Sequence, residues 1–190
     1  MEAKDFSAVT PEIEALAAKS RENNRIDISL YDKYEVKRGL RDLNGKGVLT
    51  GLTEISEVKA SEVDENGVSH PCDGKLYYRG HDVEKLIEGF TKDKRFGFEE
   101  VTYLLLFGEL PDKKQLADFN ELLGNYRCIP PNFVRDIIMK KPSRDIMNAV
   151  ARSVLMLYAY DDTADDTSGP NVVRQTLQLI SELPLLAVYS

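Results

Sequence analysis

Residues 73–86 read DGKLYYRGHDVEKL, and the change of pattern inside this stretch decides the fold. Its first half is short, aromatic and bounded by glycines, which is typical of an extended strand. Beyond Asp82, apolar residues recur at the i, i+3, i+4 and i+7 positions of one helix face: Val83, Leu86, Ile87 and Phe90. Asp82 suits the N-cap of that helix because its carboxylate can accept from first-turn amides. The stretch therefore predicts a strand that leads directly into a helix.

The residues before it predict a small β element. VLTGLTEISEV, at 48–58, is rich in β-branched and apolar side chains, and KLYYR, at 75–79, is a second extended run. Between them, DENG at 64–67 supplies residues that favour a turn. We therefore expect β structure between about Val48 and Arg79.

Helices are predicted on both sides of this element. Thr10 and Pro11 fit the N-cap and first position of a short helix whose apolar face contains Ile13, Leu16 and Ala17. Gly108 is placed to end a helix over FEEVTYLLLF, and Asp112 and Gln115 have the spacing of a capping box for the next. The apolar face of that next helix contains Leu116, Phe119, Leu122 and Leu123.

The C-terminal third also has helical periodicity. A segment between prolines predicts a stripe of Phe133, Val134, Ile137 and Ile138. The next helix is expected to bury a broad face made of Ile146, Met147, Val150, Val154, Leu157 and Tyr158. After an acidic loop, residues 171–190 resume a helix that Pro184 should kink or interrupt.

These patterns predict a mainly all-α fold with one small β element. In chain order we expect an N-terminal helical segment at 1–47, a small β unit at 48–80 and a helical segment at 81–190. The last eight residues, LPLLAVYS, are apolar and lack a helix stop signal, so the sequence is expected to be cut short there; a C-terminal helix docked on its own core is the alternative.

Composition narrows the classes of partner and compartment. The formal net charge is −7 and the basic residues are scattered, which argues against nucleic acid or an anionic membrane as a partner. The N-terminus has early acidic residues and resembles neither a secretory signal nor a transit peptide, so a cytoplasmic location is expected. Cys72 and Cys128 lie in no paired motif and are interpreted as reduced thiols.

The sequence contains few groups suited to acid–base catalysis. His70 and His81 are the only histidines, and their turn and cap positions favour structural roles. No phosphate-binding, zinc-protease or nucleophile-elbow motif occurs. The acidic loop contains Asp161, Asp162, Asp165 and Asp166, but it lacks the glycine and distal glutamate of a Ca²⁺ loop, so it is interpreted as a solvated linker without a metal site.

Several motifs together resemble the N-terminal part of citrate synthases. These are RGLRDLNGKGVLTGLTEIS (38–56), GKLYYRGHDVEKL (74–86), FEEVTYLLLFGELP (98–111) and SELPLLAVYS (181–190), and the resemblance extends from about Tyr31 to the last residue. It implies a segment of the large, nearly all-α domain, with Tyr77 and Tyr78 on alternate faces of a small β unit and Arg79 orienting the turn. The family's His-Pro-Met before the long interface helix is replaced by SRDIM at 143–147, which affects local loop packing.

The resemblance also implies an activity whose catalytic residues are absent from this sequence. Citrate synthases condense acetyl-CoA with oxaloacetate using two histidines and an aspartate, and need no further cofactor. The motifs that carry these groups, His-Gly-Gly-Ala-Asn and Gly-His-Arg, have no match here. We therefore assign no catalytic residue and expect the chain alone to be inactive.

One binding residue is carried over from the family. Arg38 with Gly39 matches an Arg-Gly that lies near the coenzyme A phosphates across the dimer, and a guanidinium can bind phosphate through two hydrogen bonds. A surface arginine is the alternative, because Lys37 and Arg41 are close in sequence.

Two classes of function remain open. One is an acyltransferase, citrate synthase or 2-methylcitrate synthase, represented by an N-terminal fragment; the other is a non-catalytic helical assembly module or split-enzyme subunit. Sequence after Ser190 would distinguish them. The resemblance implies a homodimer, and we expect self-association through an exposed patch made of Val154, Leu157 and Leu186.

Overall fold

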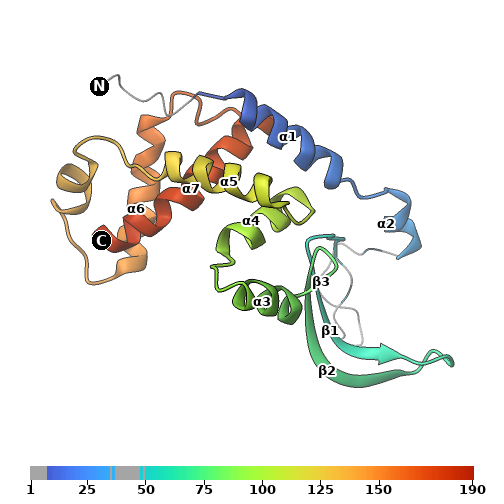
Figure 1. Ribbon diagram of the computed structural model, residues 1–190. Helices are drawn as coiled ribbons and strands as arrows, with labels where there is room; N and C mark the ends of the chain where they lie inside the picture. Colours follow the sequence, from blue (N-terminus) through green and yellow to red (C-terminus); the bar gives the residue numbers. More distant parts are fainter. Residues whose placement is uncertain (1–7, 35, 37–47, 49) are drawn as a thin grey trace. The chain divides into compact units, whose positions relative to one another are not determined.

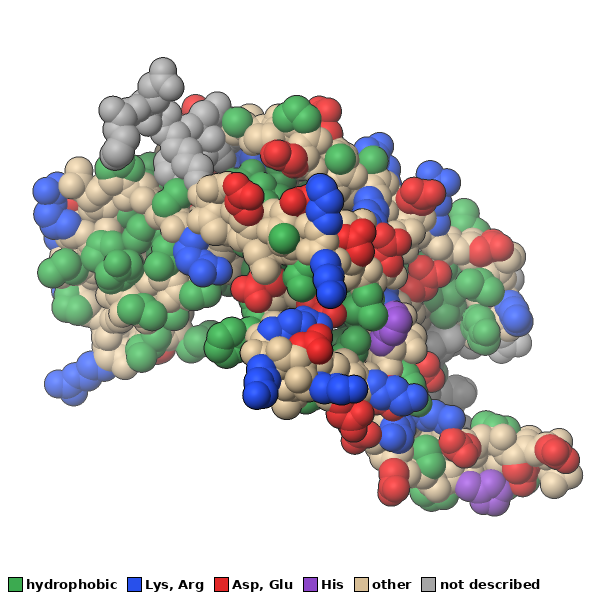
Figure 2. All heavy atoms as spheres, in the orientation of Figure 1, with side chains coloured by type: hydrophobic (Ala, Val, Ile, Leu, Met, Phe, Trp, Pro, Cys, Tyr) green, Lys and Arg blue, Asp and Glu red, His purple; other side chains and the backbone are tan. Residues whose placement is uncertain are grey.

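The computed structural model describes residues 8–34, 36, 48 and 50–190 and is mainly helical, with a small three-stranded sheet (Figure 1). The chain divides into two compact units. One contains the residues up to Lys19 together with Lys113–Ser190, and the other is Ser20–Asp112. The segments 1–47, 48–80 and 81–190 divide the chain by sequence and not by compactness, so they remain a prediction. Acidic and basic side chains are interspersed over the face seen in Figure 2, as the scattered charges of the sequence indicate.

The predicted β element is confirmed within the Ser20–Asp112 unit. Strand β1 (Ser56–Val63) pairs antiparallel with β2 (Ser69–Tyr78), and Ser56 lies opposite Tyr78. The turn between them is held by Asp64, whose carboxylate accepts from the amides of Asn66 and Val68 at 2.9 Å each. Strand pairing starts at Ser56 rather than at Val48, because the chain turns at Arg79 and Gly80 after a last bond of 2.9 Å from the Arg79 amide to the Ile55 carbonyl.

A tight turn at Arg79 and Gly80 joins β2 to the two-residue strand β3 (His81–Asp82). Both turn residues have positive φ, 49° and 80°, while Tyr78 pairs with His81 on either side. Two consecutive positive φ values define the hairpin turn that matches strand twist, and a non-glycine residue in the first position is uncommon there. The backbone of Arg79 therefore adopts a strained conformation that other contacts must stabilise.

The Arg79 guanidinium supplies those contacts. Its Nε and one terminal nitrogen donate to the Leu105 carbonyl at 3.3 and 2.9 Å, and it also donates to the Asn24 side chain at 2.5 Å. A longer bond of 3.5 Å reaches the carbonyl of Asn23, the last residue of α1 (Pro11–Asn23). Arg79 thus fixes the strand end to two helix C-termini, which agrees with the turn-orienting role implied by the resemblance.

Helix α3 (Val83–Lys92) follows β3, as predicted. The Asp82 carboxylate accepts from the Glu84 amide at 2.9 Å and caps the helix. Its apolar face is less buried than expected, since Ile87 is 49% exposed and none of the predicted face is fully buried. The unit is small, so too little protein surrounds this ten-residue helix to cover a full face.

Helix α4 (Phe98–Phe107) ends at Gly108 in the left-handed conformation, with φ 82°, which confirms the predicted stop. At its other end, a Cβ on Gly97 would lie 2.3 Å from the ring of Phe90. Only glycine therefore allows α3 and α4 to meet at this corner. The unit also contains the short helix α2 (Ser29–Lys33).

The other unit is a group of helices around one long helix. It contains α1 up to Lys19, followed by α5 (Lys113–Tyr126), a π-helical turn η1 (Val134–Ile138), α6 (Ile146–Leu157), a 3-10 turn η2 (Tyr158–Tyr160) and α7 (Gly169–Tyr189). Both α5 and α6 pack on α7. Thr10 caps α1, and Ile13 and Ala17 are buried, as predicted. Helix α7 continues through Pro184, so this proline does not interrupt it.

Two expectations about the C-terminal helices are wrong. On α6 the buried residues are Ala149, Ser153 and Leu157, whereas Met147 is 78% exposed. Leu157 and Leu186 do not form an exposed patch, because they join Phe133 and Ile138 in one buried core cluster that Val154 packs against. The long α7 helix passes beside α6 and covers these residues within the chain, a packing that periodicity along α6 alone could not indicate.

The Arg79 junction predicts a sensitive position. Arg79→Lys keeps the charge and the strained backbone but loses the planar guanidinium and its several hydrogen bonds. We therefore expect it to lower the free energy of unfolding by about 1–3 kcal/mol. Arg25→Lys, at an exposed site in the same unit, is the matched control and should change it by less than about 0.5 kcal/mol. Urea unfolding followed by circular dichroism measures both. Equal midpoints for the two variants would contradict the proposed role of the guanidinium.

Candidate functional site

The residues flagged from the sequence do not converge on one site. Arg38 lies outside the described residues. His70 sits at the exposed end of the hairpin, where its Nε2 lies 3.0 Å from the Asp64 carboxylate and this contact lowers the pKa of Asp64. His81 is exposed beside the turn and lines a shallow pocket of about 440 Å³ that also contains Asp82 and Lys85. Neither histidine is buried or held by a network typical of a general base.

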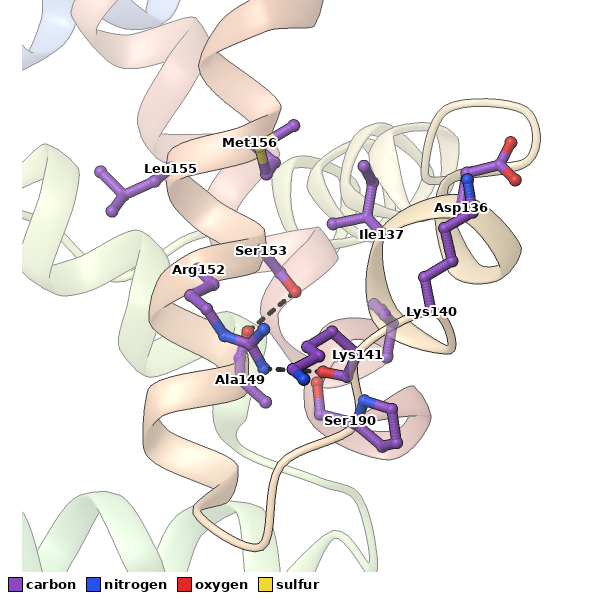
Figure 3. Close-up of a pocket in the computed structure, with 12 residues that line it drawn as sticks. Asp136, Ile137, Lys140, Lys141, Ala149, Arg152, Ser153, Leu155, Met156 and Ser190 are labelled. Atoms are coloured by element: carbon purple, nitrogen blue, oxygen red, sulfur yellow. Dashed lines mark hydrogen bonds between the residues drawn. The ribbon is translucent and has the colours of Figure 1, made fainter.

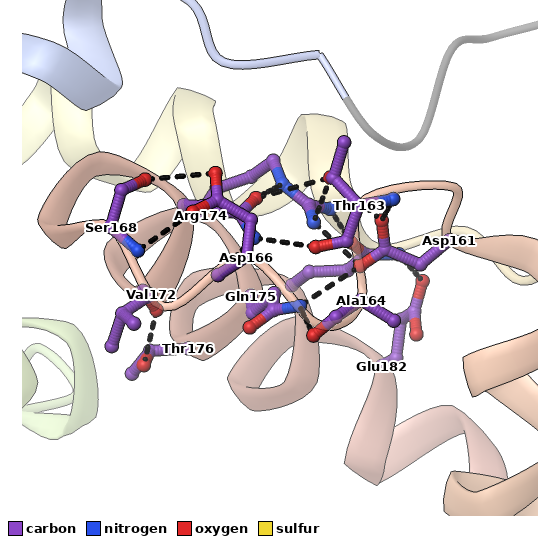
Figure 4. Close-up of polar contacts among 12 residues, drawn as sticks. Asp161, Thr163, Ala164, Asp166, Ser168, Val172, Arg174, Gln175, Thr176 and Glu182 are labelled. Carbon is purple, nitrogen blue, oxygen red and sulfur yellow. Dashed lines mark hydrogen bonds and ion pairs between the residues drawn. The ribbon is translucent and has the colours of Figure 1, made fainter.

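A buried polar cluster lies between α7 and the acidic loop that precedes it (Figure 4). Its centre is Arg174, whose side chain is fully buried. One terminal nitrogen of Arg174 donates to Asp161 at 2.5 Å, and the other donates to Gln178 at 2.9 Å. Its Nε donates to the side-chain oxygen of Asn171 at 2.8 Å. The three guanidinium nitrogens are therefore all engaged.

The loop itself is organised by the same cluster. The Asn171 amide donates to the carbonyls of Thr163 and Asp166 at 2.8 and 2.7 Å, and Gln175 donates to Asp161 and to the Ala164 carbonyl at 3.1 Å each. The expectation of a solvated linker is therefore wrong for Asp161, whereas Asp162, Asp165 and Asp166 are exposed as expected. Burial of a charged group requires a paired and hydrogen-bonded counter-charge, and the loop supplies it by folding back onto α7.

The sequence did contain a signal for this cluster. Asn171 and Arg174 fall on the helix face that also contains Leu177 and Ser181, at spacings of three, six and ten residues from Asn171. An arginine within an apolar helix face must find an acidic partner nearby, and the aspartates of the preceding loop are close in sequence. Glu182, also fully buried, follows on the same helix and accepts from Gln178 at 3.1 Å.

A pocket of about 210 Å³ adjoins the cluster, lined by apolar residues of α6 and by polar groups that include Asp161, Gln175 and Glu182. The cluster also affects Tyr126 of α5, where burial raises the pKa of the phenol and the Arg174 charge partly opposes that rise. These groups are engaged with one another, so their chemistry is that of a structural cluster. Among the described residues, no group of three or more His, Cys, Asp and Glu side chains could hold a metal ion.

Comparison with known proteins assigns the chain to a family. Residues 42–190 match the family model described as citrate synthase, C-terminal domain, which covers more than half of the chain. The chain belongs to the citrate synthase family. This confirms the resemblance inferred from the motifs, and the mainly helical structure agrees with a citrate-synthase-like helical domain.

Relatives within the family carry two different enzyme names, citrate synthase and 2-methylcitrate synthase. The 2-methylcitrate synthase 2 of Corynebacterium glutamicum is 29% identical over 152 residues, covering 80% of this chain and 34% of the relative. The citrate synthase of the same organism is 30% identical over 144 residues, with 75% and 30% covered. The crystal structure of citrate synthase from Pyrobaculum aerophilum matches with a TM-score of 0.58 and 25% identity, over 79% of this chain and 37% of that one.

The chain spans about a third of the length of these citrate synthase relatives. Within the described residues, no helix combines the length and the apolar character needed to cross a bilayer. Among the described residues, Cys72 and Cys128 form no disulfide.

The buried cluster gives a prediction for stability. Arg174→Met leaves the Asp161 carboxylate without its counter-charge, so we expect a loss of about 3–5 kcal/mol in the free energy of unfolding. Arg144→Met, at an exposed site in the same unit, should stay within about 0.5 kcal/mol of the parent chain.

A double variant tests whether the pair acts as a unit. Arg174→Met with Asp161→Leu should cost less than the sum of the two single changes, because it removes both charges from the interior. Urea unfolding of the four chains measures this coupling. Strictly additive losses would show that the pairing of Arg174 with Asp161 does not carry the stability.

Proposed function

We propose that this chain is the N-terminal part of the large domain of a citrate synthase and that it supplies structure rather than catalysis. The observation that carries the proposal is the family match over residues 42–190 combined with a sequence that contains only two histidines. The complete enzyme would condense acetyl-CoA with oxaloacetate to give citrate and CoA within the tricarboxylic acid cycle. An aspartate would take the methyl proton while histidines stabilise the enol.

The position of the two histidines supports inactivity of the chain alone. His70 and His81 are exposed and lie at a hairpin end and beside a tight turn. Residues of a catalytic set act together, so the loss of the set removes far more activity than the loss of one member would suggest. Citrate synthase and 2-methylcitrate synthase both remain candidates for the complete enzyme, since relatives with both names match at similar identity.

We further propose that the chain forms a homodimer through the outer face of α6. Met147 and Leu155 are 78% and 75% exposed and lie on the side of α6 opposite the buried Ala149, Ser153 and Leu157. Tyr158, which is 58% exposed, follows directly at the end of the helix. A helix that is apolar on both sides is normally covered on both. A second copy of the chain can cover this face symmetrically, because one self-complementary surface serves both halves of the interface.

Two smaller parts of the proposal come from the sequence. Arg38 is proposed to contact a coenzyme A phosphate of the partner subunit in the complete enzyme. A cytoplasmic location is also proposed, on the ground that Cys72 and Cys128 form no disulfide within the described residues. No cofactor beyond the CoA thioester substrate, no nucleic acid and no membrane is expected to take part.

A non-catalytic assembly role is the second candidate function, and the exposed apolar face of α6 is the observation that favours it.

A CoA-release assay tests the catalytic part. With acetyl-CoA or propionyl-CoA and oxaloacetate, the purified chain should turn over at least about a hundredfold more slowly than full-length Corynebacterium glutamicum citrate synthase, because a positioned acid and base contribute that much or more. Circular dichroism must show a helical, folded chain in the same sample. Turnover within tenfold of the control would refute inactivity.

Light scattering tests the dimer. We expect a mass near twice 21.4 kDa for the chain, and near 21.4 kDa for Met147→Glu with Leu155→Glu, because buried carboxylates would oppose the contact. Asn120→Glu with Thr167→Glu adds the same two charges at exposed polar sites and should leave the dimer intact. A parent chain that stays at 21.4 kDa across a wide concentration range would contradict the proposal.

A further inference from the structure

A second pocket, of about 400 Å³, lies within the helical unit and is distinct from the one beside the Arg174 cluster. Three segments form it: α6, the end of the π-helical turn with the residues after it, and the last residue of the chain (Figure 3). Its volume falls within the range of small-molecule sites. The apolar part of the lining comes from Ile137, Ile138, Pro142, Ala149, Leu155 and Met156.

The charged part of the lining is mainly basic. Lys140, Lys141 and Arg152 line the pocket, and within the described residues none of the three forms an ion pair. Asp136 is the acidic side chain of the lining, but Arg135 binds its carboxylate through two bonds of 2.9 and 2.8 Å and offsets its charge. In a protein with net charge −7, this pocket is therefore locally positive.

Some of the hydrogen-bond donors of Arg152 are already used within the protein, and one remains for a ligand. One terminal nitrogen donates to the Lys141 carbonyl at 3.1 Å, which holds the guanidinium in place. Its Nε is buried, yet it has no hydrogen-bond partner among the described residues, and the same holds for the Ser190 hydroxyl oxygen on the other side. Buried donors are normally paired, so the unpaired Nε of Arg152 indicates a missing acceptor.

We propose that this pocket binds a small amphipathic anion, with its anionic head on Arg152 and its apolar tail against Ile137, Ile138 and Met156. A carboxylate or a phosphate can both accept from a guanidinium, while the short aliphatic wall favours an acyl or alkyl chain over a sugar or a peptide. The site uses no residue proposed for CoA contact, and of the residues proposed for dimerisation it shares only Leu155. It therefore does not depend on the proposed function of the chain.

Calorimetry with three probes on the 190-residue chain tests the ligand class. Octanoate should bind, whereas octanamide, which has the same tail without the charge, and acetate, which has the charge without the tail, should bind at least about tenfold more weakly. Higher ionic strength should weaken octanoate binding because the contact is electrostatic. Hexyl phosphate distinguishes the two head groups, and binding of either anion in preference to octanamide supports the proposal.

Variants locate the site. Arg152→Gln should weaken octanoate binding at least about tenfold, whereas Arg127→Gln, at an exposed position outside the pocket, should leave it unchanged. If circular dichroism shows that Arg152→Gln does not fold, the affinities of the parent chain for octanoate and octanamide still test the proposal. Equal affinity for these two probes, or unchanged affinity in folded Arg152→Gln, would overturn the proposal. Loss of binding at high protein concentration would also overturn it, because a second copy would then occupy the pocket.

Discussion

The pairing of Arg174 with Asp161 is the contact on which the helical unit depends. Burial of a guanidinium is unfavourable unless every donor is satisfied, and this demand fixes both the loop before α7 and the polar residues along that helix. The loop cannot move away without leaving a charge in the interior. The apolar core around Phe133 and Leu186 supplies burial energy, but the polar cluster restricts which arrangement of loop and helix can achieve it.

The Ser20–Asp112 unit uses the opposite solution. There an arginine in a strained turn donates to backbone carbonyls at helix ends, which otherwise lack partners within their helices. Arg174 is thus neutralised by a carboxylate in the interior, while Arg79 donates to backbone carbonyls at the ends of helices. Arg79 brings together segments far apart in sequence, whereas Arg174 holds the loop just before its own helix, and neither contact requires a catalytic role for the side chain.

Local signals in the sequence were sufficient for most elements. The Asp82 cap, the Gly108 stop and the DENG turn were each predicted because the residue type and the backbone geometry are coupled within a few residues. The errors concern tertiary packing. Periodicity indicated that α6 is apolar but not which side faces α7, and composition classed Asp161 with its acidic neighbours although its partner lies thirteen residues away. The family followed from ordered motifs, whereas Arg38 remains a prediction because it lies outside the described residues.

The bonds of Arg79 also bear on the order in which the chain folds. The hairpin is made of contacts local in sequence, so it can form soon after residue 78 has been synthesised. Arg79 reaches Asn24, already present, but its bonds to Leu105 span 26 residues and must wait for α4. During synthesis the hairpin therefore exists for a time without its anchor, with Val58 and Val63 exposed on β1. Glu57, Lys59 and Glu62 on the same strand place charges along it, and such charges discourage pairing with a neighbouring nascent chain before the anchor forms.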